Sequence, residues 1–368
     1  MTFIPYNKNL RFMKPYEPGK SRGYKKSSLP IIKLSSNEAC IDYSEATKKK
    51  FRKIDANLSR YPNPKAETLR EKIARLYKVN KNNIIFGNGS DELFYLICNS
   101  YINKDLEGLH SKYGFLIYPL AIKASGGKPI FANETNYKVD INKLIRKVSR
   151  KTRVCFIANP NNPTGTYLKK NEIVDLRNKL PSKCLLVIDS AYSEYVTEKD
   201  YSDTLEYAKR RKDIIVTHTF SKIFGLAALR LGWAYCPTEV INVLERIRPA
   251  FNINTYAQEM GNLVLDDISF LKSSIKHNLF WRKKLTKEFE SLGFKVIPSV
   301  ANFITVIFKD KKIAFKVANA LEDNNIFVRK LIAYKMHNCL RITVGTEMQN
   351  KKLLSTFKKI IRKFDDFV

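Results

Sequence analysis

The sequence predicts an α/β protein with two domains. The larger domain is expected to hold a mostly parallel mixed sheet covered by helices on both faces. The smaller is an α+β domain built from the N-terminal segment and the C-terminal third. Three observations favour this fold class. Short apolar runs bounded by turns alternate with amphipathic segments, polar motifs follow the ends of these runs, and the pattern changes after about Ala250.

Four apolar runs are predicted to be strands of the larger sheet, at residues 84–86, 154–158, 185–188 and 214–217. The first ends at a glycine turn, after which residues 91–101 form a predicted helix. The second ends in a turn rich in proline and asparagine, the third at Asp189, and the fourth leads into Lys222. Because ligands of open α/β sheets bind at the carboxyl ends of the strands, these motifs are expected to meet there.

The last third of the chain has a different pattern and is assigned to the smaller domain. A long helical stretch is expected over residues 258–292, and further helices at 314–322 and at the C-terminus. The predicted strands lie at 294–297, 303–307, 326–328 and 340–344. Mixed strands with helices on one side suggest α+β packing. The predicted division is an N-terminal arm with part of the small domain (1–44), a large domain (45–255) and a C-terminal small domain (256–368).

The composition is that of a folded protein. Hydrophobic residues make up 44% of the 368 residues, too many for a disordered chain. The segment from Met1 to Tyr16 lacks the unbroken apolar core of a signal peptide, and no stretch reaches the ~18–20 apolar residues of a membrane span. The six scattered cysteines favour reduced thiols in a cytoplasmic protein. We therefore expect no membrane association.

The net charge of +31 raises nucleic acid as a partner. The lysines are nevertheless dispersed in short runs along the whole chain, and no RNA-binding or zinc-finger motif accompanies them. A solvated surface is the favoured interpretation, with electrostatic steering of anionic substrates as the alternative. We expect no nucleic-acid partner, and no metal, because the four histidines show no metal-ligand spacing.

The segment from Thr219 to Gly232 carries the most specific chemical pattern. Lys222 directly follows Ser221, and Arg230 comes one short loop later. A lysine amine forms a Schiff base with an aldehyde, and a hydroxyl together with a guanidinium holds a phosphate dianion. The pattern therefore fits a covalently held phosphorylated aldehyde.

Three motifs upstream supply further parts of such a site. Residues 87–92 place free backbone N–H groups at the start of a helix, and such groups can bind an anion. An ordinary glycine turn followed by a helix cap is the alternative interpretation of these residues. Residues 159–165 present an asparagine amide at the sheet edge, or form an ordinary loop. Asp189 ends a buried strand, where a carboxylate is costly unless it is well hydrogen-bonded or paired with a cation such as a pyridinium N–H; a helix-capping aspartate is the alternative.

With their flanks, these motifs resemble the aspartate aminotransferase fold family, the class I/II pyridoxal-phosphate aminotransferases, and within it the histidinol-phosphate aminotransferases. The resemblance covers the chain from about Tyr16 to the last helix. It is carried by residues 33–38, 60–62, 89–92, 161–165, 189–192, 221–222, 230 and 340–346. It implies pyridoxal 5'-phosphate as the cofactor and a homodimer with shared active sites.

The resemblance implies a cofactor-binding role for each matching residue. Lys222 would form the Schiff base and shuttle the proton, and Asp189 would pair with the pyridinium nitrogen. Asn162 and Tyr192 would hydrogen-bond the ring oxygen, and Phe115 would stack on the ring where many relatives have Tyr. The phosphate would be held by Ser90, Asp91, Ser221 and Arg230, and by Tyr61 of the neighbouring subunit.

For the substrates, the resemblance assigns Arg341 to the α-carboxylate of glutamate. Arg329 and Tyr16 are assigned to the phosphate of histidinol phosphate, with a surface arginine as the alternative for Arg329. Asn37 falls where the N-terminal loop of the family approaches the substrate. The next residues, Ala39 and Cys40, replace the Thr-Pro or Asn-Pro of relatives, so this loop is expected to differ.

The implied reaction converts histidinol phosphate and 2-oxoglutarate to imidazole-acetol phosphate and glutamate, in L-histidine biosynthesis. Within the enzyme class, an aromatic amino acid or prephenate aminotransferase and a threonine-phosphate decarboxylase remain alternatives. Outside it, the basic surface leaves a non-enzymatic nucleic-acid-binding protein as an alternative, which predicts steeply salt-dependent binding. The intact set of Lys222, Asp189, Asn162 and Arg230 favours an enzyme.

Overall fold

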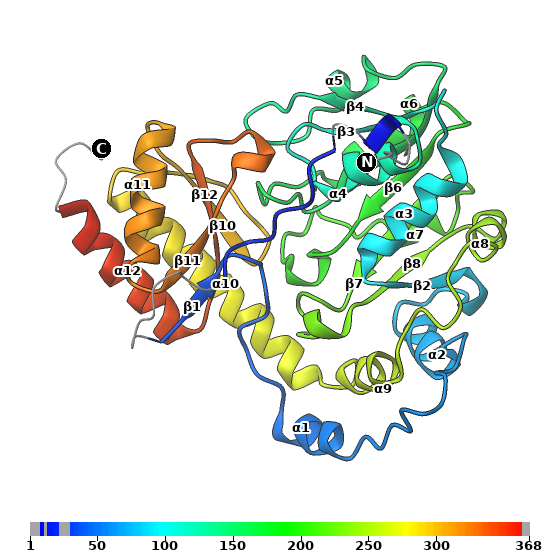
Figure 1. Ribbon diagram of the computed structural model, residues 1–368, viewed down its shortest axis with the longest axis horizontal. Coiled ribbons are helices and arrows are strands. Elements are labelled where there is room, and N and C mark those ends of the chain that lie inside the picture. The colour runs from blue at the N-terminus through cyan, green and yellow to red at the C-terminus, as the bar shows by residue number, and fades with distance from the viewer. Residues whose placement is uncertain (1–7, 11–12, 22–29, 363–368) are drawn as a thin grey trace, which may run out of the picture.

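The computed structural model describes residues 8–10, 13–21 and 30–362. Two sheets organise this part of the chain, and helices cover both of them (Figure 1). The fold class is confirmed as mixed α/β. The ends of the predicted N-terminal arm (1–44) and C-terminal domain (256–368) include residues outside the described ranges, and the division into three segments stays a prediction.

The larger sheet has seven strands in the order β2-β8-β7-β6-β5-β3-β4. Their bounds are Ile84–Asn88 for β2, Leu231–Tyr235 for β8, Ile214–Thr219 for β7, Leu185–Asp189 for β6, Thr152–Ala158 for β5, Glu107–Ser111 for β3 and Lys128–Ala132 for β4. The five strands from β7 to β4 are parallel, and β8 runs antiparallel to both of its neighbours. The four predicted strands are all present, each longer than its apolar run.

Successive side chains of a strand point to opposite faces of the sheet, and in this protein helices cover both faces. In β5, Cys155 and Ile157 are buried on one face, while Val154 and Phe156 are buried on the other. The first face packs against α2 (Glu67–Leu76), α5 (Ile141–Ile145), α6 (Lys170–Lys179), α7 (Leu205–Ala208) and α9 (Thr255–Val264). The second packs against α3 (Ser90–Tyr101), α4 (Ile117–Ala124) and α8 (Thr238–Leu244).

The smaller sheet has five strands in the order β1-β11-β12-β10-β9. They span Ile32–Leu34 (β1), Ile326–Lys330 (β11), Cys339–Thr343 (β12), Phe303–Ile307 (β10) and Lys295–Ile297 (β9). Its strand β1 pairs parallel with β11 across almost 300 residues, and the other pairs are antiparallel. Apolar residues of α10 (Ile268–Ser291), α11 (Lys311–Glu322) and α12 (Glu347–Arg362) pack on this sheet.

The predicted helical stretch over 258–292 is two helices rather than one. Helix α9 ends at Val264 and α10 begins at Ile268. The break is fixed by Asp267, whose side chain accepts the Phe270 N–H as a helix cap and also accepts the Ser44 N–H at 2.9 Å. This second bond ties the break to the start of α1 (Glu45–Arg52), so the bend between α9 and α10 is set by a contact distant in sequence.

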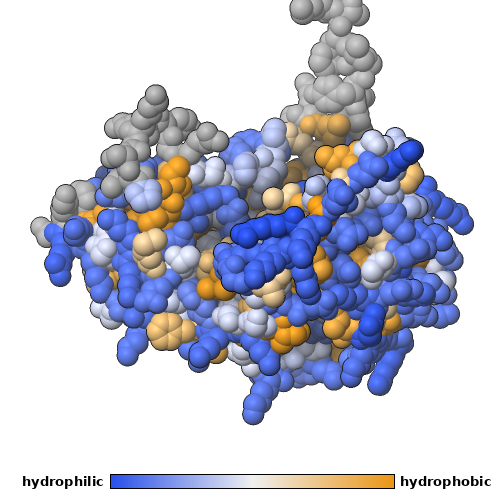
Figure 2. Space-filling view, turned by 90° about the horizontal axis from the view of Figure 1, so that it is seen from below, coloured by the Kyte–Doolittle hydropathy of each residue, from blue (hydrophilic) through white to orange (hydrophobic). Residues whose placement is uncertain are grey.

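Most of the face in Figure 2 is hydrophilic, with apolar side chains scattered over it. Among the described residues, no helix combines the length and the apolar character that a membrane span requires.

Candidate active site

Strand register brings the polar ends of three strands of the larger sheet together. Ala158 at the end of β5 pairs with Asp189 at the end of β6, and Asp189 pairs in turn with Thr217 of β7. Strand β7 ends at Thr219, and Phe220 alone separates it from Ser221 and Lys222. A pocket opens at this edge, and its wall is completed by residues of β11, β12 and the N-terminal segment.

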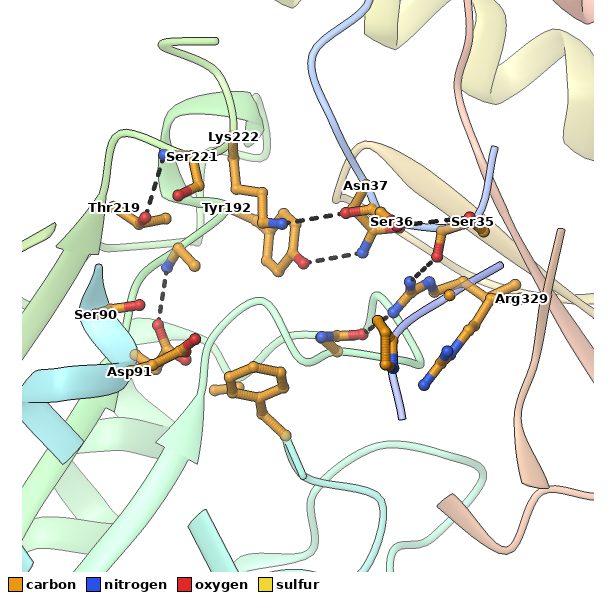
Figure 3. A pocket seen from close by; sticks show the side chains of 18 of the residues that line it. Ser35, Ser36, Asn37, Ser90, Asp91, Tyr192, Thr219, Ser221, Lys222 and Arg329 are labelled. Carbon is orange, nitrogen blue, oxygen red and sulfur yellow. Dashed lines mark hydrogen bonds between the residues drawn. The ribbon is translucent and has the colours of Figure 1, made fainter. Parts of the chain in front are cut away.

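Lys222 projects into this pocket beside Tyr192 (Figure 3). Its Nζ donates a hydrogen bond to the carbonyl of Ser36 at 3.3 Å and lies 5.7 Å from the centre of the Tyr192 ring. Withdrawal from water, reinforced by the positive charge of Arg341, lowers the pKa of Lys222 from 10.5 to about 8. An amine with this pKa is partly unprotonated near neutrality and can act as a nucleophile and proton carrier.

Asp189 lines the pocket and is buried, with only 5% of its surface exposed. Its Oδ1 accepts the Ala191 N–H at 3.2 Å and the Thr217 hydroxyl at 3.4 Å, and its Oδ2 accepts the Tyr118 hydroxyl at 2.7 Å. Burial raises the pKa of Asp189 from 3.8 to about 6. A buried carboxylate of this kind is stabilised by a cation in the pocket.

The start of α3, Ser221 and Arg230 form a cradle of hydrogen-bond donors at one end of the pocket. Helix α3 begins at Ser90, where its first backbone N–H groups have no partner within the helix. The Arg230 Nη1 donates to the Ser221 hydroxyl at 3.2 Å, and Nη2 lies 3.5 Å from the Asp91 carboxylate. These hydroxyl, amide and guanidinium groups are the donors that a phosphate dianion requires.

Two glycines allow the parts of this cradle to lie in close contact. Gly89 has a φ of +76°, and a Cβ there would run into the Arg230 guanidinium. A Cβ on Gly232 would run into the backbone nitrogen of Ser90. The Gly89 N–H also donates to the Arg230 carbonyl at 2.8 Å, which fixes the two sides of the cradle to one another.

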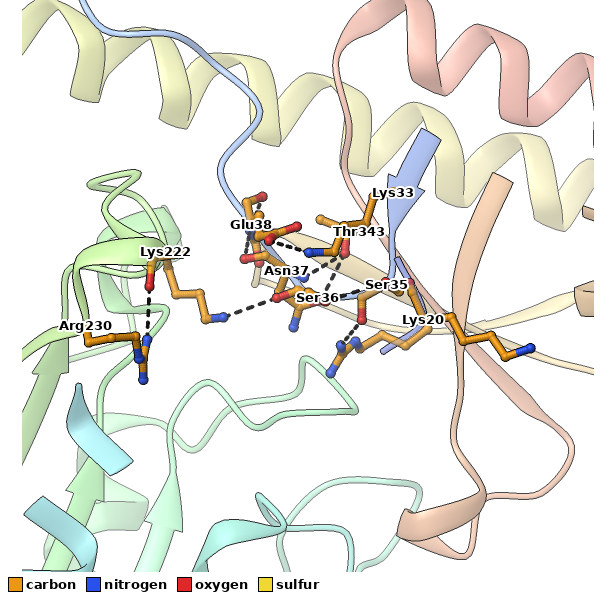
Figure 4. A network of polar contacts seen from close by, with 12 residues as sticks. Lys20, Lys33, Ser35, Ser36, Asn37, Glu38, Lys222, Arg230 and Thr343 are labelled. Atoms are coloured by element: carbon orange, nitrogen blue, oxygen red, sulfur yellow. Dashed lines mark hydrogen bonds and ion pairs between the residues drawn. The ribbon is translucent and has the colours of Figure 1, made fainter. Parts of the chain in front are cut away.

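A polar network connects the middle of the pocket to the smaller sheet (Figure 4). The Asn37 amide donates to the Tyr192 hydroxyl at 2.9 Å, and the Asn37 N–H donates to the Thr343 hydroxyl at 2.9 Å. Arg341 Nη1 donates to Asn162 Oδ1, and its Nη2 donates to the Ser35 carbonyl at 2.9 Å. Asn37 is therefore bonded to Tyr192, and Arg341 to Asn162, although the four residues come from four separate segments.

Arg329 lies at the opposite end of the pocket from Ser90 and Asp91 (Figure 3). Only 8% of its surface is exposed, so it is not the surface arginine that the sequence left as an alternative. Its Nη2 donates to the carbonyl of Glu17, in the same N-terminal segment that contributes Tyr16 to the pocket wall. The pocket thus has a cationic group at both ends, with Lys222 between them.

Of the predicted site residues, thirteen line this pocket and one does not. Those lining it are Tyr16, Asn37, Ser90, Asp91, Phe115, Asn162, Asp189, Tyr192, Ser221, Lys222, Arg230, Arg329 and Arg341. Tyr61 lies on the surface with 81% of its area exposed, stacked on Phe251 with ring centres 4.4 Å apart. Its assignment to the site of a neighbouring subunit stays a prediction.

Sequence reasoning missed several residues at the site. Ser35, Ser36 and Tyr334 line the pocket, and Tyr118 bonds Asp189 from behind it. Ser35 and Ser36 lie in residues 33–38, which carry part of the resemblance, but the resemblance assigned no role to either serine. Tyr118 left no local signal, because its bond to Asp189 joins α4 to the end of β6, far away in the chain.

The family model for class I and II aminotransferases matches residues 30–357. The chain belongs to this family. A histidinol-phosphate aminotransferase of Pelagibacter ubique is 39% identical over 359 residues, covering 97% of this chain and 99% of the relative. A relative of the same name from Zymomonas mobilis is 40% identical over 351 residues, or 95% of each chain. The chain therefore also belongs with the histidinol-phosphate aminotransferases.

A solved structure supports the same fold. The histidinol-phosphate aminotransferase of Sinorhizobium meliloti, in complex with pyridoxal-5'-phosphate, superposes with a TM-score of 0.89. The similarity covers 98% of this chain and 99% of the other. Because the two sequences are only 22% identical, it shows a shared fold and no more.

Proposed function

We propose that this protein is a pyridoxal-phosphate-dependent aminotransferase of L-histidine biosynthesis. It would transfer the amino group of glutamate to imidazole-acetol phosphate, giving histidinol phosphate and 2-oxoglutarate, and catalyse the reverse reaction. The single observation that carries the proposal is the arrangement of one pocket. A lysine with a lowered pKa stands between an anion cradle around Arg230 and a second cationic end at Arg329 and Arg341. Such a pocket suits a phosphorylated cofactor and a phosphorylated substrate together.

The residues present fit the cofactor in three independent ways. Asp189 is a buried carboxylate whose three hydrogen-bond donors, from Tyr118, Ala191 and Thr217, are all neutral, which suits a protonated ring nitrogen as its cationic partner. The cradle of α3, Ser221 and Arg230 suits the phosphate. Lys222 supplies the amine. When bound, pyridoxal phosphate supplies an aldehyde that condenses with amines and a ring that accepts the electron pair released at the substrate α-carbon.

The protein's own groups would orient the reactants and move protons. Lys222 Nζ, with a pKa of about 8, can accept the proton from the substrate α-carbon and return it. The Tyr192 hydroxyl and the Asn162 amide both belong to residues that line the pocket, where both can bond the ring oxygen of the cofactor. Arg341 would bind the glutamate α-carboxylate, and Arg329 with Tyr16 would bind the substrate phosphate.

We also propose that the protein works as a homodimer in the cytoplasm. The exposed ring pair of Tyr61 and Phe251 supports a dimer, because large aromatic side chains on a monomer surface are favoured at subunit contacts. All six cysteines are free thiols, which is the state favoured in a reducing compartment.

A half-reaction titration tests this function. Protein loaded with pyridoxal phosphate is mixed in turn with histidinol phosphate, glutamate, phenylalanine and tyrosine, and the absorbance of the bound cofactor is followed. We expect histidinol phosphate and glutamate to convert the cofactor to its amine form at the lowest concentrations. Equal responses to phenylalanine or tyrosine would assign the protein to aromatic transamination, and carbon dioxide release from threonine phosphate would assign it to decarboxylation.

Lys222→Ala provides the companion test. The variant should lose both turnover and covalent attachment of the cofactor, which borohydride reduction followed by mass spectrometry detects. Lys212→Ala is the matched control, because the Lys212 side chain is 86% exposed and pairs with Glu239 on the surface. Full activity of Lys222→Ala would refute the assignment.

A further inference from the structure

Tyr118 occupies a position behind the pocket where it contacts two groups assigned to the cofactor ring. It is the second residue of α4, and its N–H donates to the Phe115 carbonyl at 3.1 Å. Its ring packs edge-on against Phe115 with centres 5.8 Å apart. Phe115 precedes α4 by two residues, and the turn that enters the helix places its ring against that of Tyr118.

The Tyr118 ring is held rigidly by aromatic packing. It stacks on Phe156 of β5 with centres 4.9 Å apart and planes 9° from parallel, and it meets Phe94 of α3 edge-on at 5.1 Å. None of its surface is exposed. A side chain so confined has one available orientation, and in that orientation its hydroxyl reaches Oδ2 of Asp189 at 2.7 Å.

This hydroxyl makes the shortest of the hydrogen bonds to Asp189. The Ala191 N–H and the Thr217 hydroxyl reach the other oxygen at 3.2 and 3.4 Å. A donor to a carboxylate stabilises the ionised form, so the Tyr118 bond opposes the rise in the pKa of Asp189 that burial causes. Burial and the neighbouring carboxylate raise the pKa of Tyr118 well above its usual value, so the phenol keeps its proton and remains the donor.

We propose that Tyr118 is a positioning residue, which aims the Asp189 carboxylate at the cofactor ring nitrogen and keeps it ionised. The inference rests on the proposed function, since it needs a cofactor with a ring nitrogen. Tyr118 itself lies behind the pocket and acts through Asp189. It also fixes the spacing between the stacking ring of Phe115 and the carboxylate, because one rigid side chain contacts both.

The test compares two variants with two ligands. Tyr118→Phe removes the hydroxyl and keeps the packed ring. Tyr77→Phe is the matched control, since the Tyr77 hydroxyl also donates to a carboxylate, that of Glu194 at 3.2 Å, and its ring packs on Trp233. Each cofactor-free protein is titrated with pyridoxal phosphate and with its 1-deaza analogue, in which a C–H replaces the ring nitrogen.

Tyr118→Phe should weaken binding of pyridoxal phosphate about 10-fold, the usual effect of losing a hydrogen bond to a charged group. Its affinity for the deaza analogue should stay within about 2-fold of that of the unmodified protein, because this ligand has no ring nitrogen with which the Asp189 carboxylate could pair. Turnover with pyridoxal phosphate should fall through kcat, with KM little changed. Tyr77→Phe should bind both ligands as the unmodified protein does.

The outcomes separate this inference from the proposed function. Equal weakening of both ligands by Tyr118→Phe would mean that the hydroxyl only supports packing, and unchanged affinity for both would mean that it has no role. Either result overturns the inference. If the unmodified protein itself fails to bind pyridoxal phosphate or to prefer it over the deaza analogue, the proposed function or the role of Asp189 fails instead.

Discussion

Arg341 and Asn162 are joined by a hydrogen bond that links the two sheets across the pocket. Arg341 lies in β12 of the smaller sheet, and Asn162 lies in the turn after β5 of the larger one. The Arg341 Nε is buried and has no hydrogen-bond partner among the described residues. Asn162 and Ser35 each accept one bond from a terminal nitrogen that carries two N–H groups, so the guanidinium is held in place and retains donors for an incoming carboxylate.

Replacing Arg341 should affect the glutamate half-reaction most strongly. Arg341→Lys keeps one positive charge but loses the planar pair of donors, so kcat/KM for glutamate should fall about 100-fold, consistent with 2–5 kcal/mol for a buried charge contact. Stopped-flow measurement of the half-reaction checks this. Cofactor affinity should change much less than kcat/KM for glutamate, because Arg341 lies outside the cradle of α3, Ser221 and Arg230 and reaches the cofactor site only through Asn162. Arg153→Lys, whose guanidinium bonds backbone carbonyls away from the pocket lining, is the control. An unaltered kcat/KM for glutamate contradicts the assignment.

The pH dependence of cofactor capture should report the lowered pKa of Lys222. Only the unprotonated amine attacks the aldehyde, so the rate at which cofactor-free protein captures pyridoxal phosphate should rise with pH and level off above about 8. Burial is the main cause of the low pKa and the charge of Arg341 the next. Arg341→Gln should therefore shift the profile to higher pH. A rate that still rises steeply near pH 10, as for an ordinary lysine, would argue against this environment.

Asp189→Asn should stabilise the cofactor-free protein in a pH-dependent way. The pKa of Asp189 is raised from 3.8 to about 6 by burial, so its protonated form contributes stability that is present below about pH 4 and is lost as pH rises through about 6. The amide does not titrate and keeps that stability. The difference should reach on the order of 2–3 kcal/mol near pH 7 and close toward pH 4.

Thermal melting across this pH range measures the effect. A difference between Asp189→Asn and the unmodified protein that stays constant with pH would show that the carboxyl is not titrating. With pyridoxal phosphate added, the order of stabilities should reverse, because the amide lacks the charge that stabilises a protonated ring nitrogen.

Mixed dimers test the placement of Tyr61. Lys222→Ala and Tyr61→Ala should each have little activity alone. If Tyr61 serves the neighbouring subunit, a mixed dimer contains one site with both residues intact, and random mixing should restore about a quarter of the unmodified activity. Remixing after mild denaturation, followed by an activity assay, checks this. If Tyr61 serves its own subunit, no mixture recovers activity.

Of the twelve strands in the described residues, the sequence predicted eight and missed β1, β3, β4 and β8. Strand β3 contains Gly108 and His110, and β4 lies at the edge of the sheet with a single neighbour. Both depend on pairing with adjacent strands for their conformation, and neither carries a periodic apolar pattern. The break between α9 and α10 was missed for a related reason, because Asp267 ends the helix together with Ser44, far away in the chain.

By itself, the sequence determined the chemistry held within single segments. Ser221, Lys222 and Arg230 lie close in the chain, and the turn carrying Asn162 is set by its own prolines, so local geometry presents these groups to one site. Only the tertiary structure decided the bond from Tyr118 to Asp189 and the link from Arg341 to Asn162. These contacts join elements far apart in the chain. Strand register and helix packing fix their distances, and neither leaves a signal in the residues nearby.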